Sequence, residues 1–202
     1  MRLLPFVLSA AAAFAAAPFW EAKAPADWSD AEVEELLTNS PWAQEAISGA
    51  SSEGAPVYIA SALPIREAEA ERDRRERAQE KHPKAPVEDP TADEYADFLG
   101  ENEGKYIVLA VPVRDPRTLE IPAEVKLMEQ QCVLKVGKRK YKMTGHFPPS
   151  LSDGFLRLVF PRVVTEADKT LRFELYIPAV SNPYRFAEFR VRDMKYKGRL
   201  EL

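Results

Sequence analysis

The residues of this chain that could bind a ligand by charge gather in one short segment of its second half. Lysine and arginine make up most of residues 138–142, and one tyrosine lies among them. These candidate binding residues are Lys138, Arg139, Lys140, Tyr141 and Lys142. Such a cluster suits an anionic polymer, either an envelope polymer or nucleic acid, through salt-sensitive charge pairing. The alternative is a lysine-rich hairpin tip that keeps a sheet edge soluble and unpaired.

A second candidate binding site lies where a strand is expected to lead directly into a helix. Residues 57–60 form a short apolar run, and Pro64 suits the first position of a helix. Ser61 would cap backbone amides there, and Arg66 in the first turn could hold a carboxylate or a phosphate. The alternative is an ordinary connection in which Arg66 pairs with a carboxylate of the protein.

Residues typical of catalysis or metal binding are scarce. The two histidines, His82 and His146, and the single Cys132 do not have the spacing of a zinc site. The chain also lacks nucleophile-elbow, phosphate-loop and dinucleotide motifs, so we predict no catalytic residue, metal or cofactor. A hydrolase with a carboxylate pair stays open, because two acids can meet from distant parts of a chain. The candidates for such a pair are Asp115, Glu174 and Glu188.

The first residues have the pattern of a secretory signal. Arg2 precedes an apolar stretch and small residues, and residues 13–15 offer an A-x-A cleavage site. We therefore expect residues 1–17 to be removed on export, to the periplasm or beyond the cell, and no transmembrane span in the mature chain. A buried N-terminal helix is the alternative. The lone Cys132 cannot form an intramolecular disulfide, and its apolar neighbours predict burial.

Residues 27–43 are the best-specified helical segment. Ser29 and Glu32 have the spacing of a capping box, and Asn39 is suited to close the helix in the left-handed conformation. Trp28 and Trp42 bracket the segment. We therefore expect a short helix that is held at both ends against a larger body.

Three segments together resemble one protein family. Residues 28–43 contain W-S-x-x-E-V followed by S-P-W-A, residues 61–68 read S-A-L-P-I-R-E-A, and residues 193–202 read D-M-x-Y-x-G-x-L-E-L. They are similar to the signatures of a family of small exported bacterial proteins with no assigned activity. The resemblance implies export and brings no catalytic residues with it.

The hydrophobic pattern predicts an α+β fold. Residues 67–81 are almost entirely charged and, with a helix candidate at 91–99, indicate a helical excursion into solvent at about 70–103. The most apolar run, residues 106–111, predicts a central strand. If it pairs in parallel with residues 57–60, the intervening helix is a crossover.

The second half of the chain is expected to be rich in strands. A helix at 121–129 should precede a hairpin around Gly137. The remaining expected strands are 155–160 and 171–177, which are the clearest pair, then 184–191 and 196–202, the last of which ties the C-terminus into the sheet. We therefore predict a single α+β domain over residues 18–202, with a mixed sheet and short helices on one face.

The distribution of charge is compatible with a binding protein. The net charge is −4, with an acidic first half and a basic second half. The two halves either complement each other within one fold or offer the basic half to an anionic partner. The sequence favours a non-enzymatic exported binding or interaction module, whose partner is an anionic polymer or an envelope protein. The alternative is an envelope hydrolase that uses a carboxylate pair.

Overall fold

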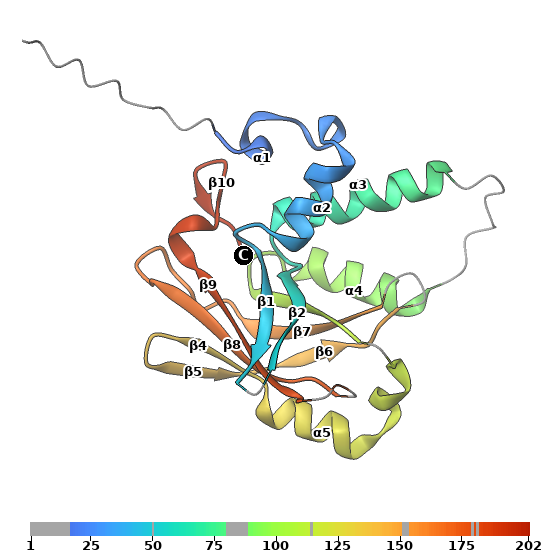
Figure 1. Cartoon of the computed structure of the whole chain (residues 1–202), viewed down its shortest axis with the longest axis vertical. Coiled ribbons are helices and arrows are strands. Elements are labelled where there is room, and N and C mark those ends of the chain that lie inside the picture. Colours follow the sequence, from blue (N-terminus) through green and yellow to red (C-terminus); the bar gives the residue numbers. More distant parts are fainter. Residues whose placement is uncertain are drawn as a thin grey trace, which may run out of the picture.

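Nine strands form one curled sheet in the order β5-β4-β8-β9-β1-β2-β3-β7-β6 (Figure 1). The structure is a computed structural model, and it describes residues 17–49, 51–79, 89–113, 115–150, 154–178, 180 and 182–202. The strands are β1 (Ala43–Ser48), β2 (Ser51–Ile59), β3 (Tyr106–Pro112), β4 (Val133–Val136), β5 (Arg139–Lys142), β6 (Gly145–Phe147), β7 (Phe155–Pro161), β8 (Thr170–Tyr176) and β9 (Tyr184–Arg190).

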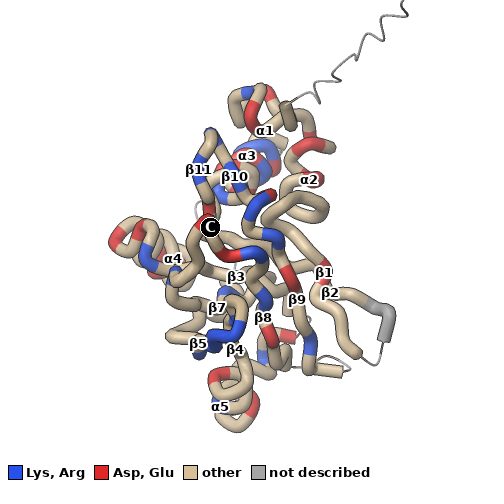
Figure 2. The backbone as a smooth tube through the Cα atoms, turned by 90° about the vertical axis from the view of Figure 1, so that its left-hand side faces the viewer, with Lys and Arg blue, Asp and Glu red and all other residues tan. Residues whose placement is uncertain are grey.

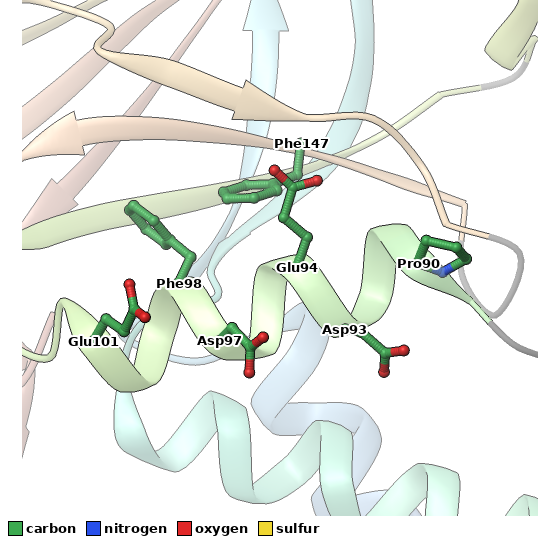
Figure 3. A pocket seen from close by; sticks show the side chains of 7 residues that line it. All are labelled: Pro90, Asp93, Glu94, Asp97, Phe98, Glu101 and Phe147. Carbon is green, nitrogen blue, oxygen red and sulfur yellow. The ribbon is translucent and has the colours of Figure 1, made fainter.

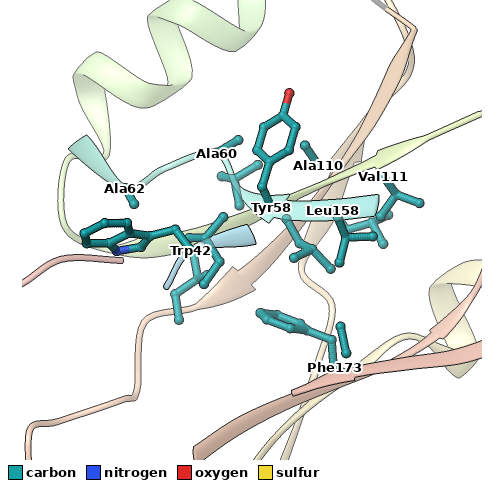
Figure 4. Packing of buried hydrophobic residues seen from close by; sticks show 14 of the residues in the cluster. Trp42, Tyr58, Ala60, Ala62, Ala110, Val111, Leu158 and Phe173 are labelled. Carbon is teal, nitrogen blue, oxygen red and sulfur yellow. The ribbon is translucent and has the colours of Figure 1, made fainter. Parts of the chain in front are cut away.

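One stretch of chain joins the two ends of this sheet. β5 pairs with β4, β6 pairs with β7, and only Met143 and Thr144 separate β5 from β6. The Thr144 N–H donates to the carbonyl of Val159 on β7 (2.8 Å). The sheet therefore curls around the core, where the rings of Phe160 on β7 and Phe173 on β8 lie 5.1 Å apart. Figure 4 shows Phe173 beneath the buried residues of β2, β3 and β7.

The α+β class is confirmed, but the expected mixed sheet is wrong. Every strand pair in the described ranges is antiparallel, including β2 and β3, where Tyr58 lies opposite Ala110. The helices between them, α3 (Leu63–Gln79) and α4 (Pro90–Glu101), therefore do not form a parallel crossover. β7 and β8 form near their predicted positions, but β7 pairs with β3 and β6, whereas β8 pairs with β4 and β9.

The helices lie in two places. Helices α2 (Asp30–Thr38), α3 and α4 cover the outer side of the sheet near β1 to β3, and α5 (Pro122–Gln131) lies at the other end beside β8 (Figure 1). Met128 of α5 is fully buried, as expected. No helix in the parts of the chain that the structure describes has the length and apolar character needed to cross a bilayer.

Short elements complete the fold. They are α1 (Phe19–Ala22), η1 (Pro25–Asp27), η2 (Pro116–Glu120), η3 (Val191–Asp193), β10 (Lys195–Tyr196) and β11 (Arg199–Leu200). β10 and β11 form a separate hairpin, so the expected joining of residues 196–202 to the main sheet is wrong. The end of the chain is nevertheless held, because Leu202 is buried and its carbonyl accepts a hydrogen bond from Arg162 Nη1 (3.2 Å).

Helix α2 begins as the sequence predicts. The Ser29 side chain accepts from the Glu32 N–H (3.2 Å), and the Glu32 carboxylate accepts from the Ser29 N–H (2.7 Å), which completes the capping box. Trp28 and Trp42 are 2% and 0% exposed, so both ends are fixed to the body. Asn39 has a φ of −144°, so the predicted left-handed closure is wrong.

The described parts of residues 70–103, which are 70–79 and 89–103, do not form an excursion separate from the domain as expected. Both helices pack against the domain, and Glu71 of α3 and Tyr95 of α4 are buried. Glu71 accepts hydrogen bonds from Arg74 (2.8 Å) and Arg75 (2.7 Å). The ring of Phe98 on α4 lies 5.2 Å from that of Phe147 on β6. The charged composition concealed this packing, because part of the buried face of α3 is satisfied by ion pairs instead of apolar contacts.

Candidate functional site

The cationic segment folds into the predicted hairpin, made of β4 and β5. Gly137 turns the chain with a φ of 59°, a left-handed conformation that glycine adopts without steric cost. β5 is an end strand of the sheet order, and Lys138, Lys140 and Lys142 are all exposed. Figure 2 shows the blue lysine and arginine positions concentrated on β4 and β5. We call Lys138, Lys140 and Lys142 the lysine strip.

The charges of this hairpin divide into neutralised and unneutralised groups. Arg139 pairs with Asp168 (3.0 Å), and Lys135 on β4 pairs with Glu174 on β8. The side chains of the lysine strip form no ion pair or hydrogen bond with any residue the structure describes. Tyr141 lies opposite the buried Leu134, so its ring packs towards the core side of the hairpin. The surplus positive charge therefore lies on the three lysines.

The cationic face continues across β4 and β8. Lys135 lies opposite Lys140 on β5 and opposite Arg172 on β8, and residues opposite each other on antiparallel strands share a face. The Arg172 guanidinium lies 3.9 Å from the ring centroid of Phe186 on β9, a cation–π contact. Glu188 on β9 lies opposite Arg172. This neighbouring face is therefore mixed in charge, whereas the lysine strip carries only positive charge.

Sequence reasoning missed the contact between Arg172 and Phe186. The alternation of residues 171–177 correctly predicts that Arg172 lies on the solvent side of its strand. Its neighbour depends on the pairing of β8 with β9, which no local pattern fixes.

Ser61 and Arg66 both lie in the wall of one cavity beside the start of α3. The Ser61 hydroxyl accepts from the Val108 N–H (2.9 Å), so this side chain ties the start of α3 to β3. The Arg66 side chain is partly exposed and forms no hydrogen bond or ion pair with a described residue. It lies in the wall shared by two cavities of about 230 and 260 Å³.

The three carboxylates considered for a hydrolase do not all lie together, because Asp115 precedes η2 whereas Glu174 on β8 and Glu188 on β9 are diagonal neighbours on one face of the sheet. Asp115 pairs with Arg117 (2.9 Å), whose hydrogen bonds lower the pKa of the carboxyl. Glu174 is held by Lys135, and Glu188 is exposed on β9. A general acid needs a carboxyl with a raised pKa, and the shift at Asp115 is in the opposite direction. Among the described residues, no group of three or more potential ligands could hold a metal ion.

A wide hollow of about 680 Å³ follows α4 and is strongly acidic (Figure 3). Its carboxylates are Asp93, Glu94, Asp97 and Glu101, all of which are exposed. In Figure 3, Asp93 and Asp97 point away from the rings of Phe98 and Phe147. Because all four carboxylates are exposed to water, the hollow lacks the buried acid that a carboxylate-pair mechanism requires.

The remaining candidate reactive side chains have structural roles. Cys132 is buried as predicted, and burial raises the pKa of its thiol to about 11, so the thiol stays protonated. His146 Nδ1 lies 3.9 Å from a carboxylate oxygen of Glu129. His82 and most of the expected signal segment, residues 1–16, lie outside the described residues.

A polar cluster between α3 and the sheet was also missed. Tyr58 on β2, Ala110 on β3 and Arg157 on β7 lie in one row, so Tyr58 and Arg157 share the face that α3 and α4 cover. The Tyr58 hydroxyl donates to Glu69 on α3 (2.8 Å), and Arg157 lies 3.5 Å from the same carboxylate oxygen. Burial raises the pKa of Tyr58, so its phenol stays neutral. An arginine within the apolar run of 155–160 is the signal that could have revealed the cluster.

No protein-family model, curated protein or solved structure matches this chain.

Proposed function

We propose that this protein is a non-enzymatic binding module which, after export, holds a polyanionic polymer of the cell envelope against the lysine strip. The observation that carries the proposal is the unneutralised charge of Lys138, Lys140 and Lys142. The other cations of the same hairpin, Lys135 and Arg139, have acidic partners. The strip is therefore the part of the hairpin whose charge remains available to an external anion.

The geometry of the strip favours a polymer over a small anion. Lys140 and Lys142 are two residues apart on one strand, so they lie on the same face at a separation of about 7 Å. A chain with repeated anionic groups can contact both lysines and the neighbouring Lys138 at once, and each further contact is then intramolecular. Each neutralised anionic group also releases bound counterions, which adds a favourable entropy term.

Export is the second part of the proposal. It is supported by the signal-like pattern of residues 1–17 and by the resemblance to exported proteins. Mass spectrometry of protein recovered from the periplasm or medium should find a new N-terminus between Phe14 and Pro18. Recovery of the chain with Met1 intact from the soluble cytoplasm would contradict export.

The binding test must separate polymer recognition from protection of the sheet edge, since edge lysines also deter aggregation. Two triple variants make this separation. K138Q/K140Q/K142Q removes the charge, whereas K138E/K140E/K142E keeps a charged edge of the opposite sign. A control for the glutamate variant, K105E/K126E/K169E, changes the net charge by the same amount at exposed lysines outside the strip.

Binding to long-chain polyphosphate is measured over a range of salt concentrations. Loss of three contacts should reduce the slope of log K against log salt by about 2 to 3, taking about 0.7–0.9 per contact from nucleic acids. The glutamine and glutamate variants should both lose affinity, and the control should retain it. An unchanged slope, or an equal loss in the control, would contradict the strip as the site. The lysines protect the sheet edge if the glutamine and glutamate variants both keep their affinity for polyphosphate and the glutamine variant alone shows an increased tendency to aggregate. If single-stranded DNA of equal charge binds more tightly than polyphosphate, the ligand is a nucleic acid and not an envelope polymer.

A further inference from the structure

A cavity of about 260 Å³ lies between α3 and α4 on the side of the molecule that faces β6 and β7. Helix α3 contributes Arg66 and Arg72 to its wall, α4 contributes Tyr95 and Leu99, and Phe147 and Arg157 come from the sheet. Its volume is below the range of about 300–1,000 Å³ that is typical of sites for drug-sized ligands. Any ligand that fits must therefore be small.

The charged side chains that line this cavity carry one excess positive charge. Glu69 and Asp73 also lie in the wall. Arg157 pairs with Glu69 (3.5 Å) and Arg72 with Asp73 (3.6 Å), whereas the Arg66 side chain has no ion pair or hydrogen bond within the described ranges. A ligand with a single negative charge would balance the site. A doubly charged anion would leave one charge uncompensated in a partly buried position, which is costly.

Tyr95 provides an independent indication of a ligand. Its ring lies 5.3 Å from that of Phe147, and the Arg157 guanidinium lies 4.4 Å from its centroid. Tyr95 is only 8% exposed, and its hydroxyl oxygen is shielded from solvent without a hydrogen bond to any described residue. Burial and then the charge of Glu69 raise the pKa of this phenol, whereas Arg157 and, more weakly, Arg66 oppose the rise. A buried hydroxyl without a partner costs stability, so its place in a cavity wall points to a bound group that completes it.

We propose that this cavity binds a small monocarboxylate. The carboxylate pairs with Arg66 and accepts a hydrogen bond from the Tyr95 hydroxyl, while the apolar body packs against Leu99 and Phe147. Charge-assisted hydrogen bonds of this kind fix the position of the head group, and the apolar wall selects against hydrated inorganic anions. The inference does not rest on polymer binding, because none of the lysine strip lines this cavity.

The test uses the folded mature chain, with residues 1–17 removed, and follows its amide signals by NMR during titration. The probes are benzoate and hexanoate, with benzamide as the neutral match to benzoate and inorganic phosphate as the anion without an apolar body. We expect saturable shifts of α3 and α4 amides, with a dissociation constant for a carboxylate of about 1 mM or tighter, and none with benzamide. No saturable shift with either carboxylate up to about 20 mM, or tighter binding of phosphate, would overturn the proposal.

One variant and its matched control locate the site. Arg66→Gln should weaken carboxylate binding by about tenfold or more, because a charge-assisted contact is lost. Arg77→Gln removes the same charge from an exposed position of α3 outside the cavity and should bind as the unmodified protein does. Equal binding by the Arg66 and Arg77 variants would overturn the assignment.

Tyr95→Phe tests the hydroxyl separately from the ligand. It should weaken carboxylate binding, yet leave the melting temperature of the ligand-free protein unchanged or higher, because an unpartnered polar group is removed. A fall of more than about 3 °C would show that the hydroxyl already has a protein partner, and the argument from Tyr95 would then fail.

Discussion

The indole Nε1 of Trp42 donates a 2.8 Å hydrogen bond to the carbonyl of Glu201, 159 positions away in the sequence. The ring is fully buried and makes edge contacts with Trp20 and Tyr196, at centroid distances of 5.9 and 6.5 Å. One side chain therefore fixes the segment after α2 to the hairpin of β10 and β11. Trp28 is also buried, but its Nε1 has no hydrogen-bond partner in the described part of the chain.

The two tryptophans should differ when only their hydrogen-bonding capacity and part of their volume are removed. Trp42→Phe leaves the carbonyl of Glu201 without its donor, which should add about 1–3 kcal/mol to the cost of the lost volume. Trp28→Phe removes an unpartnered N–H and should cost less. Alanine at either position should destabilise by about 3–5 kcal/mol. Urea unfolding gives these values, and equal costs for the two phenylalanine variants would contradict the role of the Trp42 hydrogen bond.

Packing of α3 against the sheet can be tested at two apolar residues of its first turn. Ile65 is fully buried, so Ile65→Ala should destabilise by about 2–5 kcal/mol. Leu63 is 37% exposed and serves as the control, with an expected loss nearer to 1 kcal/mol, since less apolar area is uncovered. Chemical denaturation of both variants provides the measurement. Similar small losses for the two variants would contradict the docking of this first turn against the sheet.

Local signals in the sequence predicted local structure well. The capping box of α2, the turn at Gly137 and the alternation of β8 depend on residues close together in the chain, and all three are present. The antiparallel pairing of β2 with β3 depends on the path that α3 and α4 take between them. Helical periodicity does not encode that path, so the mixed sheet was a reasonable but wrong expectation.

In the candidate sites too, features formed by neighbouring residues could be predicted from the sequence, whereas contacts between distant segments could not. The cationic segment was visible in the sequence, but the pairing of Arg139 with Asp168 and of Lys135 with Glu174 required the folded sheet. The cavity near Arg66 brings together α3, α4, β6 and β7. Arg66 was a candidate from its place in the first turn of a helix, whereas Tyr95 lies within the helix predicted at 91–99 and was not a candidate.

Cys132 should be unreactive in the folded protein. It is fully buried, its sulfur lies 3.6 Å from the carbonyl of Tyr176, and its thiol has a pKa of about 11. The thiolate that attacks disulfide reagents is therefore scarce and inaccessible at pH 8. An aromatic disulfide reagent should label it only at the rate of unfolding, with full reaction in denaturant. Rapid labelling without denaturant would show that the thiol reaches solvent in the native state.

The buried carboxylate of Glu71 should make stability depend on acidic pH. Hydrogen bonds from Arg74 and then Arg75 lower its pKa to about 2 from an ordinary value of 4.5. Arg75 also donates to Asp30 Oδ1 and to the carbonyl of Trp28, so the ion pairs of Glu71 help to fasten α3 to α2. Since the pKa is lower in the folded state, the contribution of Glu71 is fully present above pH 4.5 and is lost as the pH falls from 4.5 towards 2.

Glu71→Gln should therefore lower the urea midpoint at pH 7, and the difference from the unmodified protein should shrink as the pH falls through this window. Other carboxylates also titrate there, so the difference between the two proteins is the quantity to follow. Glu76→Gln is the matched control, because Glu76 lies on the same helix, is exposed and forms no ion pair or hydrogen bond with a described residue. Its difference from the unmodified protein should be small at every pH. If the Glu71 difference stays constant from pH 7 to pH 3, the carboxylate acts through its shape and neutral hydrogen bonds, and its charge does not hold α3 against α2.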